Sequence, residues 1–287
     1  MPDLRVLLTF DDGPAPPRTK KILDILAVGN GGSPIIAAFF VQTLACVTIR
    51  KKRAPFRDCS AYSLAKPLKP FRMSTPKGTA VVRQAYQAGH VIGIHTGSLL
   101  DHLPHPCRAV ASPDPITPLL APVPANGLES DLIRASHDIS LLAEAPEFVR
   151  ATGLYFGTPE ESALVHVAYQ RLHLRHVGVN VDSLDADITG KVVAEFPRMV
   201  PSKRREKIRD RVNAQLRTAI RVALQQNYAP LIVLFHDINP VTVLFLAQYI
   251  DAITRAVSEL SSKTLTAKFP ASRAEAEGIL HSSLIVQ

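Results

Sequence analysis

The sequence predicts an α/β fold in which about seven parallel strands alternate with helices around a barrel. Short apolar runs lie near residues 5, 36, 92, 149, 178, 233 and 266, and most are followed by a segment with apolar residues at helical spacing. The chain has 287 residues, of which 46% are hydrophobic and 20% are charged, so it can bury one large core. We therefore expect a single domain over residues 1–287.

The first strand ends in two adjacent acids. In LRVLLTFDDGP, an apolar run leads into Asp11 and Asp12, and Gly13-Pro14 then turns the chain. Successive side chains at a strand end point in different directions, so one carboxylate can hold a cation while the other acts as a base. An aspartate that caps the following helix is the alternative interpretation.

The segments after this strand continue the alternation. Pro17–Val28 has an apolar stripe at helical spacing, and the continuous apolar run Pro34–Gln42 predicts a buried parallel strand. The stretch 43–77 is rich in proline and basic residues, has weak periodicity and is predicted as an insertion. A helix over Thr79–Ala88 and a strand over His90–Ile94 follow.

The second half of the chain repeats the pattern after one more interruption. Residues 103–126 are rich in proline and aperiodic, which predicts a second insertion or long loop. The remaining predicted elements are the helices Leu128–Ala143 and Pro159–Arg171, a strand within Arg175–Asp182, the helix Ser202–Asn227 capped by Ser202, the strand Leu231–Phe235, the helix Val241–Leu260, the strand Leu265–Phe269 and the helix Ala274–Ile285.

Composition restricts the class of protein. No run of about 18 apolar residues occurs, so we expect no transmembrane segment. No signal segment is visible, so we expect a cytoplasmic protein as written, or a secreted or periplasmic one if a leader was removed. The three cysteines are too few and too irregularly spaced for a disulfide framework or a cysteine metal site.

The net charge of +8 comes from basic residues gathered around 50–57 and 191–221. A solvated helix face explains the second cluster, and attraction to a polyanion is the alternative. We expect no nucleic-acid partner, because no recognised module or aromatic stacking surface accompanies the charge.

Several motifs resemble those of one family. TFDDGP resembles the first motif of the NodB-type polysaccharide deacetylases, carbohydrate esterase family 4. The resemblance implies a distorted (β/α)7 barrel of the NodB deacetylase type, with Asp11 as catalytic base and Asp12 as metal ligand. PIIAAFFVQ is similar to the second strand of that family. PLIVLFHDINP resembles its fifth motif, which makes His236 the catalytic acid and places Leu234 in the substrate pocket.

The second motif departs from the pattern. In the family, a second histidine follows the first by four residues, and the pair clamps a divalent metal. GIHTGSLLDH supplies His95 at the first position but Leu99 at the second. His102 is the replacement ligand that we predict, with Asp101 and His105 as alternatives. A purely structural His95 is the other interpretation.

The third and fourth motifs are also altered. EFVRATGLYFG resembles the third motif without its prolines, with Arg150 in the position that orients the catalytic aspartate and Tyr155 beside the oxyanion N–H. VDSLDAD resembles the fourth, with Asp182 at the substrate pocket and Asp185 next to the catalytic histidine. Ala186 replaces the tryptophan that walls the acetyl pocket. A carboxylate beside an imidazole favours the protonated form, which a general acid requires. A surface arginine and an aspartate-rich turn are the alternative interpretations.

The resemblance implies metal-dependent removal of N-acetyl groups from an N-acetylglucosamine-containing polysaccharide such as chitin, peptidoglycan or an exopolysaccharide. The expected metal is zinc, with cobalt or nickel as alternatives. The competing hypothesis is a catalytically impaired relative that binds carbohydrate or a protein partner, which Leu99 and Ala186 favour. Asp11, Asp12 and His236 favour catalysis, because buried acids cost stability when no chemistry needs them.

Overall fold

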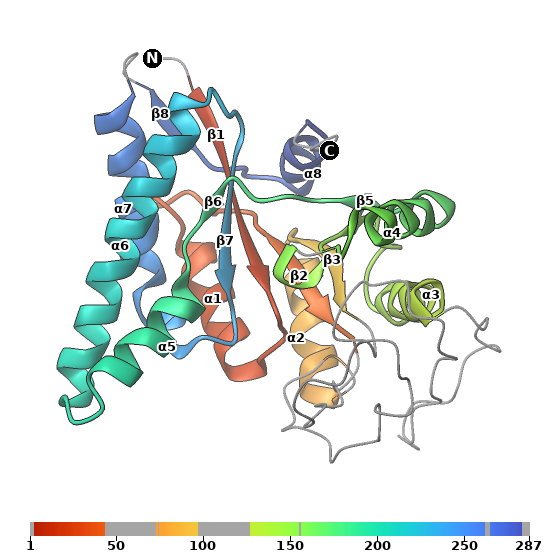
Figure 1. Ribbon diagram of the computed structural model, residues 1–287, viewed down its shortest axis with the longest axis horizontal. Helices are drawn as coiled ribbons and strands as arrows, with labels where there is room; N and C mark the ends of the chain where they lie inside the picture. The colour runs from red at the N-terminus through yellow and green to blue at the C-terminus, as the bar shows by residue number, and fades with distance from the viewer. Residues whose placement is uncertain are drawn as a thin grey trace. The chain divides into compact units, whose positions relative to one another are not determined.

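The computed structural model in Figure 1 describes residues 3–43, 73, 75–96, 127–154, 156–261 and 265–282. These residues fall into two compact units. Unit 1 comprises Met1–Phe39, Gln87–Val91 and Gly178–Gln287, and unit 2 comprises Phe40–Tyr86 and Ile92–Val177. The two predicted insertions lie almost entirely outside the described residues, as do all three cysteines.

Unit 1 is built on parallel strands. Strand β1 (Asp3–Asp11) lies between the start of β2 (Ala38–Gln42) and β7 (Leu231–His236), and β6 (Val181–Asp182) pairs with the other edge of β7. A short strand, β8 (Thr266–Lys268), pairs with the beginning of β1. Both β1 and β7 are apolar and almost completely buried along their length, as expected for a parallel sheet covered on both faces.

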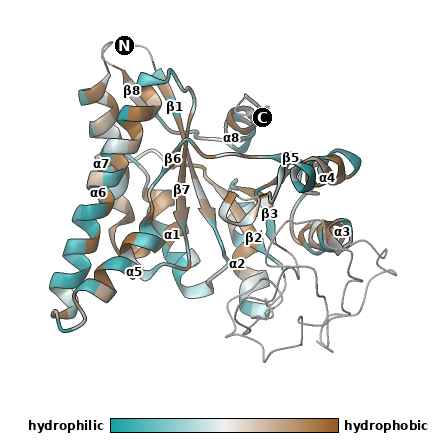
Figure 2. Cartoon of the chain, viewed as in Figure 1, coloured by the Kyte–Doolittle hydropathy of each residue, from teal (hydrophilic) through white to brown (hydrophobic). Residues whose placement is uncertain are grey.

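The helices of unit 1 follow these strands. They are α1 (Pro16–Val28), α5 (Asp185–Glu195), α6 (Pro201–Gln225), α7 (Pro240–Leu260) and α8 (Arg273–Ser282). The long helices α6 and α7 lie side by side, and each shows a hydrophilic and a hydrophobic side in Figure 2. The buried stripe of α6 is the one that its periodicity predicts, namely Ile208, Val212, Leu216, Ile220 and Ala223.

Among the described residues, α7 is one helix that is long and apolar enough to cross a membrane by length and composition alone. Half of its most apolar window is buried inside the protein, and it packs against α1, α6 and β8. That packing is what a core helix of a folded domain requires.

Unit 2 also has a parallel sheet. In it, β3 (Val91–Thr96), β4 (Phe148–Val149) and β5 (Arg175–His176) are hydrogen-bonded in chain order. The helices are α2 (Pro76–Gln87), α3 (Gly127–Ser140) and α4 (Pro159–Arg171), with a short 3-10 turn, η2, over Thr152–Leu154. A capping box explains the start of α4: the Thr158 hydroxyl accepts from the Glu161 amide, and the Glu161 carboxylate accepts from the Thr158 amide.

The predicted α/β fold, in which parallel strands alternate with helices, is confirmed, and every strand pair described is parallel. Three details of the prediction are wrong. Where one strand is predicted within Arg175–Asp182, the structure has two short strands. The first, β5, pairs with β4, and the second, β6, pairs with β7. Ser202 does not cap α6: the N-cap is Val200, Pro201 opens the helix, and no side chain bonds the cap. Helix α5, which follows the fourth motif directly, was not predicted.

Candidate active site

The two adjacent acids lie where β1 ends. Asp11 is the last residue of the strand and is 3% exposed. Asp12 is half-buried and has a φ of 72°, in the left-handed region. An aspartate tolerates this conformation better than most residues do.

His236 lies beside Asp11 on the neighbouring strand. The two residues are paired in the register of β1 and β7, at the carboxyl ends of both strands. The side chain of His236 is 21% exposed, so its ring is largely enclosed but retains an open side. A carboxylate and an imidazole from adjacent strands therefore meet at the same edge of the sheet.

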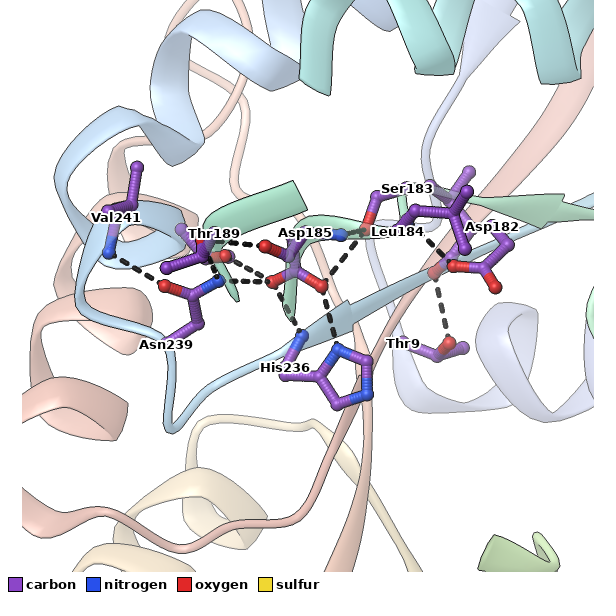
Figure 3. A network of polar contacts seen from close by, with 11 residues as sticks. Thr9, Asp182, Ser183, Leu184, Asp185, Thr189, His236, Asn239 and Val241 are labelled. Carbon is purple, nitrogen blue, oxygen red and sulfur yellow. Dashed lines mark hydrogen bonds and ion pairs between the residues drawn. The ribbon is translucent and has the colours of Figure 1, made fainter. Parts of the chain in front are cut away.

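Asp185 holds the imidazole from the side, as Figure 3 shows. Its Oδ1 lies 2.7 Å from His236 Nδ1, and its Oδ2 accepts from the backbone N–H of His236 at 3.2 Å. Asp185 is 1% exposed and begins α5, where an acid interacts favourably with the helix dipole. This bond fixes the ring so that Nε2 is the nitrogen left to face a substrate.

Three further side chains donate to the Asp185 carboxylate. Oδ1 accepts from Ser183 Oγ at 3.2 Å, and Oδ2 accepts from Thr242 Oγ1 and from Asn239 Nδ2, the latter at 3.4 Å. Asn239 Nδ2 also donates to Thr189 Oγ1 at 3.1 Å. These donors satisfy the hydrogen-bonding capacity of the buried carboxylate and fix its position.

The carboxylates around His236 set its protonation state. Burial alone lowers the pKa of an imidazole, but here the hydrogen bond and charge of Asp185, with the charges of Asp12 and Asp11, outweigh it. Together they raise the pKa of His236 to about 9. The histidine is therefore a cationic acid at neutral pH.

Asp182 and Leu234, both predicted at the substrate pocket, are register partners on β6 and β7. Asp182 is half-buried, and its Oδ1 accepts from the Leu184 amide at 2.8 Å, which turns the chain into α5. Burial raises the pKa of Asp182. Leu234 is 6% exposed, so most of its side chain belongs to the core.

Unit 2 holds two of the other predicted residues, His95 in β3 and Arg150 directly after β4. His95 is 2% exposed, and its Nδ1 lies 2.9 Å from the carbonyl oxygen of Arg150, so Nδ1 donates and Nε2 is the nitrogen suited to a metal. Arg150 is fully buried, with its guanidinium over the Phe40 ring at 4.2 Å and its Nε donating to the Val177 carbonyl at 3.1 Å.

The structure thus brings Asp11, Asp12, Asp182, Asp185, Leu234 and His236 together within unit 1. His102 and Tyr155 lie outside the described residues, as do Leu99, Asp101 and His105.

Sequence reasoning missed the residues that support the site. Ser183, Thr189, Asn239 and Thr242 surround Asp185, and Asp237 is buried directly after His236. Only Asn239 carried a signal: the Asn-Pro pair is typical of a helix start, and its Oδ1 does accept from the Val241 amide at 3.0 Å.

The family model for polysaccharide deacetylase matches residues 1–117, which confirms the resemblance over that part of the chain. None of the curated protein sequences matches the chain.

Solved structures of similar fold have low sequence identity. The catalytic domain of a peptidoglycan N-acetylglucosamine deacetylase from Eubacterium rectale is 17% identical, with 95% of this chain and 94% of that one covered and a TM-score of 0.50. A family 4 carbohydrate esterase from Streptomyces lividans, in complex with acetate, is 17% identical, with 94% of each chain covered and a TM-score of 0.49. A wild-type CE4-family pseudoenzyme from Bacillus anthracis is 13% identical, with 88% of this chain and 61% of that one covered and a TM-score of 0.48.

Proposed function

We propose that this chain, a divergent relative of the polysaccharide deacetylases, is a metal-dependent hydrolase. It removes N-acetyl groups from a polysaccharide that contains N-acetylglucosamine. The observation that carries the proposal is the pairing of Asp11 with His236 at the ends of β1 and β7, with Asp185 2.7 Å from the imidazole. Amide hydrolysis needs a base for the attacking water and an acid for the leaving amine, and these residues supply both.

The donors in the described residues fit a divalent cation in part. No group of three His, Cys, Asp or Glu side chains that could hold a metal occurs among those residues. The resemblance assigns Asp12 and His95 to the metal. Their chemistry fits that role, because carboxylate and imidazole are preferred zinc ligands and the Nδ1 of His95 is already engaged by a carbonyl. A third ligand, His102 in our proposal, would come from the segment after β3. When bound, zinc, cobalt or nickel acidifies a coordinated water and polarises the acetamide carbonyl.

The protein's own residues then divide the proton transfers. Asp11 takes a proton from the attacking water while the oxygen of that water bonds to the acetyl carbon. His236 gives its Nε2 proton to the sugar nitrogen as the C–N bond breaks, and Asp185 keeps the ring oriented and cationic until that moment. The products are acetate and a free amino sugar. Arg150 and the backbone near Tyr155 keep the supporting roles that the resemblance implies.

A second candidate function is carbohydrate or partner binding without turnover. Leu99 in place of the second metal-binding histidine favours it, and so does Ala186 in place of the pocket tryptophan. In that case the charged network of unit 1 would serve only to stabilise the fold, although a buried ionic cluster is a costly way to do so.

The experiment that separates the two functions measures metal content and acetate release on the same preparation. We expect about one zinc, cobalt or nickel ion per chain, lost in Asp12→Ala, and acetate release from N-acetylglucosamine oligomers or peptidoglycan. A chain that binds no metal after reconstitution and releases no acetate would contradict the proposed hydrolase and favour the binding protein.

A further inference from the structure

One buried carboxyl group has no part in the proposed reaction. Asp237, directly after His236, is 1% exposed and lies against the loop that carries the two catalytic-site acids. Its Oδ2 accepts from Thr19 Oγ1 at 2.5 Å, and its Oδ1 has no hydrogen-bond partner among the described residues. Such a group costs stability, so its position calls for a compensating role.

The carboxyl group fills the space beside Gly13, the residue after Asp12. A Cβ on Gly13 would lie 2.1 Å from Asp237 Oδ2 and 2.6 Å from both Oδ1 and the carboxyl carbon. Asp237 therefore packs directly on the backbone of the β1–α1 loop, at a point where only glycine leaves room for it.

Thr19 joins the same carboxyl group to the start of α1. Its hydroxyl donates to Asp237 and accepts from the backbone N–H of Ala15 at 2.8 Å. Ala15 is the N-cap residue of α1 and cannot supply a side-chain cap itself. The relay from Ala15 through Thr19 to Asp237 thus holds the end of the loop that begins at Asp12.

The backbone of the β7–α7 loop makes further bonds to the same region. The Asp237 N–H donates to the Asp11 carbonyl at 3.4 Å, and Arg18 Nη1 donates to the Ile238 carbonyl at 2.5 Å. Both ends of the β1–α1 loop are therefore attached to the residues that follow His236.

We propose that Asp237 is a positioning residue that, through Gly13 and Thr19, fixes the β1–α1 loop and so the orientation of Asp11 and Asp12 relative to His236. This inference rests on the proposed function for its catalytic consequence, but the loop contact itself is independent of any activity. Misplacement of a catalytic group by about 1 Å can cost on the order of 100-fold in rate.

The test removes the relay without changing charge. Thr19→Val deletes the hydroxyl and keeps the shape, and Thr19→Ser restores the hydroxyl. The control is Asn180→Ala, because Asn180 joins the Pro230 carbonyl (2.9 Å) to the Ile232 N–H (2.7 Å) at the other end of β7. Each variant is assayed for kcat, KM and hydrogen exchange of the backbone amides of residues 9–16.

We expect Thr19→Val to lower kcat about tenfold or more with KM little changed, and to speed exchange in residues 9–16. Thr19→Ser should restore both values, and Asn180→Ala should change neither. Asp237→Ala should act like Thr19→Val if it folds.

Two results would overturn the positioning role: unchanged exchange in Thr19→Val, or faster exchange with wild-type kcat. The remaining result is a wild type that shows no activity while Thr19→Val, but not Asn180→Ala, still speeds hydrogen exchange in residues 9–16. That result would contradict the proposed function and would support the role of Asp237 in fixing the loop.

Discussion

The two units differ in how well their motifs match the family pattern. In unit 1, Asp11, His236 and Asp185 match the family pattern, and the carboxylate of Asp185 is surrounded by donors. In unit 2, His95 and Arg150 match, but the histidine that should follow four residues after His95 is Leu99. The residues expected to act as base and acid are therefore retained, whereas the motif expected to supply two metal-binding histidines is altered.

The difference has a physical basis. Removing one member of the unit 1 network would leave a buried charge without its partner, at an energetic cost of several kcal/mol.

The largest effect should follow from removing the base. We expect Asp11→Asn to lower kcat by about three orders of magnitude or more, because the attacking water loses its proton acceptor. Acetate release measures this. Asp24→Asn is the matched control, since Asp24 is an exposed acid of α1 whose one ion pair among the described residues is with Lys20. Equal rates for Asp11→Asn and the wild type would refute the role of Asp11.

The second effect concerns the acid. Asp185→Asn keeps the shape of the side chain but removes the charge that raises the pKa of His236 to about 9. We expect kcat to fall by about 10²–10⁴. The alkaline limb of the pH–rate profile should move to lower pH, since a weaker partner lets the imidazole lose its proton earlier.

NMR titration of the His236 ring provides an independent measurement of the same pKa. An unchanged ring pKa in Asp185→Asn would mean that Asp185 does not control the protonation of His236, whatever happens to the rate.

The third prediction is a gain of zinc affinity when the missing histidine of the second motif is restored. Leu99→His restores the four-residue spacing from His95, so we expect about tenfold tighter binding of zinc and a matching rise in acetate release at limiting metal. Titration with zinc under a competing chelator measures the affinity, and Leu99→Gln, which lacks the imidazole, is the control. A zinc affinity that does not change would show that another group already fills the third position.

Much of this site could be predicted from the sequence, because Asp11 and His236 each end a strongly apolar strand, and parallel strands bring their carboxyl ends to one edge. The partners of Asp185 could not be predicted. Ser183 lies two residues away, but Asn239 and Thr242 are more than fifty residues along the chain, and only the tertiary fold unites them.

The division of the strand predicted within Arg175–Asp182 had a similar cause. The residues of the whole run have strand-like alternation, and only the available pairing partners determine that β5 bonds to β4 and β6 bonds to β7. Local periodicity thus locates the strands and their carboxyl ends, while long-range contacts determine strand length and the hydrogen-bond partners of each charged side chain.

The smallest effect is on stability. Burial raises the pKa of Asp237 to about 7, so the folded protein keeps a proton that the unfolded chain loses near pH 4, and stability should fall as the pH rises from about 4 to 7. His236 acts in the next range, because its stabilisation is complete below about pH 6.5 and is lost as the pH rises through about 9.

Asp237→Asn should remove the loss of stability between about pH 4 and 7 and keep the loss that follows the deprotonation of His236. The difference should be about 1–3 kcal/mol in the free energy of unfolding, measured with urea at about pH 4.5 and pH 7. His236→Gln should show the reverse pattern, with the first decline kept and the second lost. If the wild type and Asp237→Asn have parallel stability curves between about pH 4 and 7, the carboxyl of Asp237 is ionised throughout that range, and its contact with Gly13 and Thr19 is that of an anion.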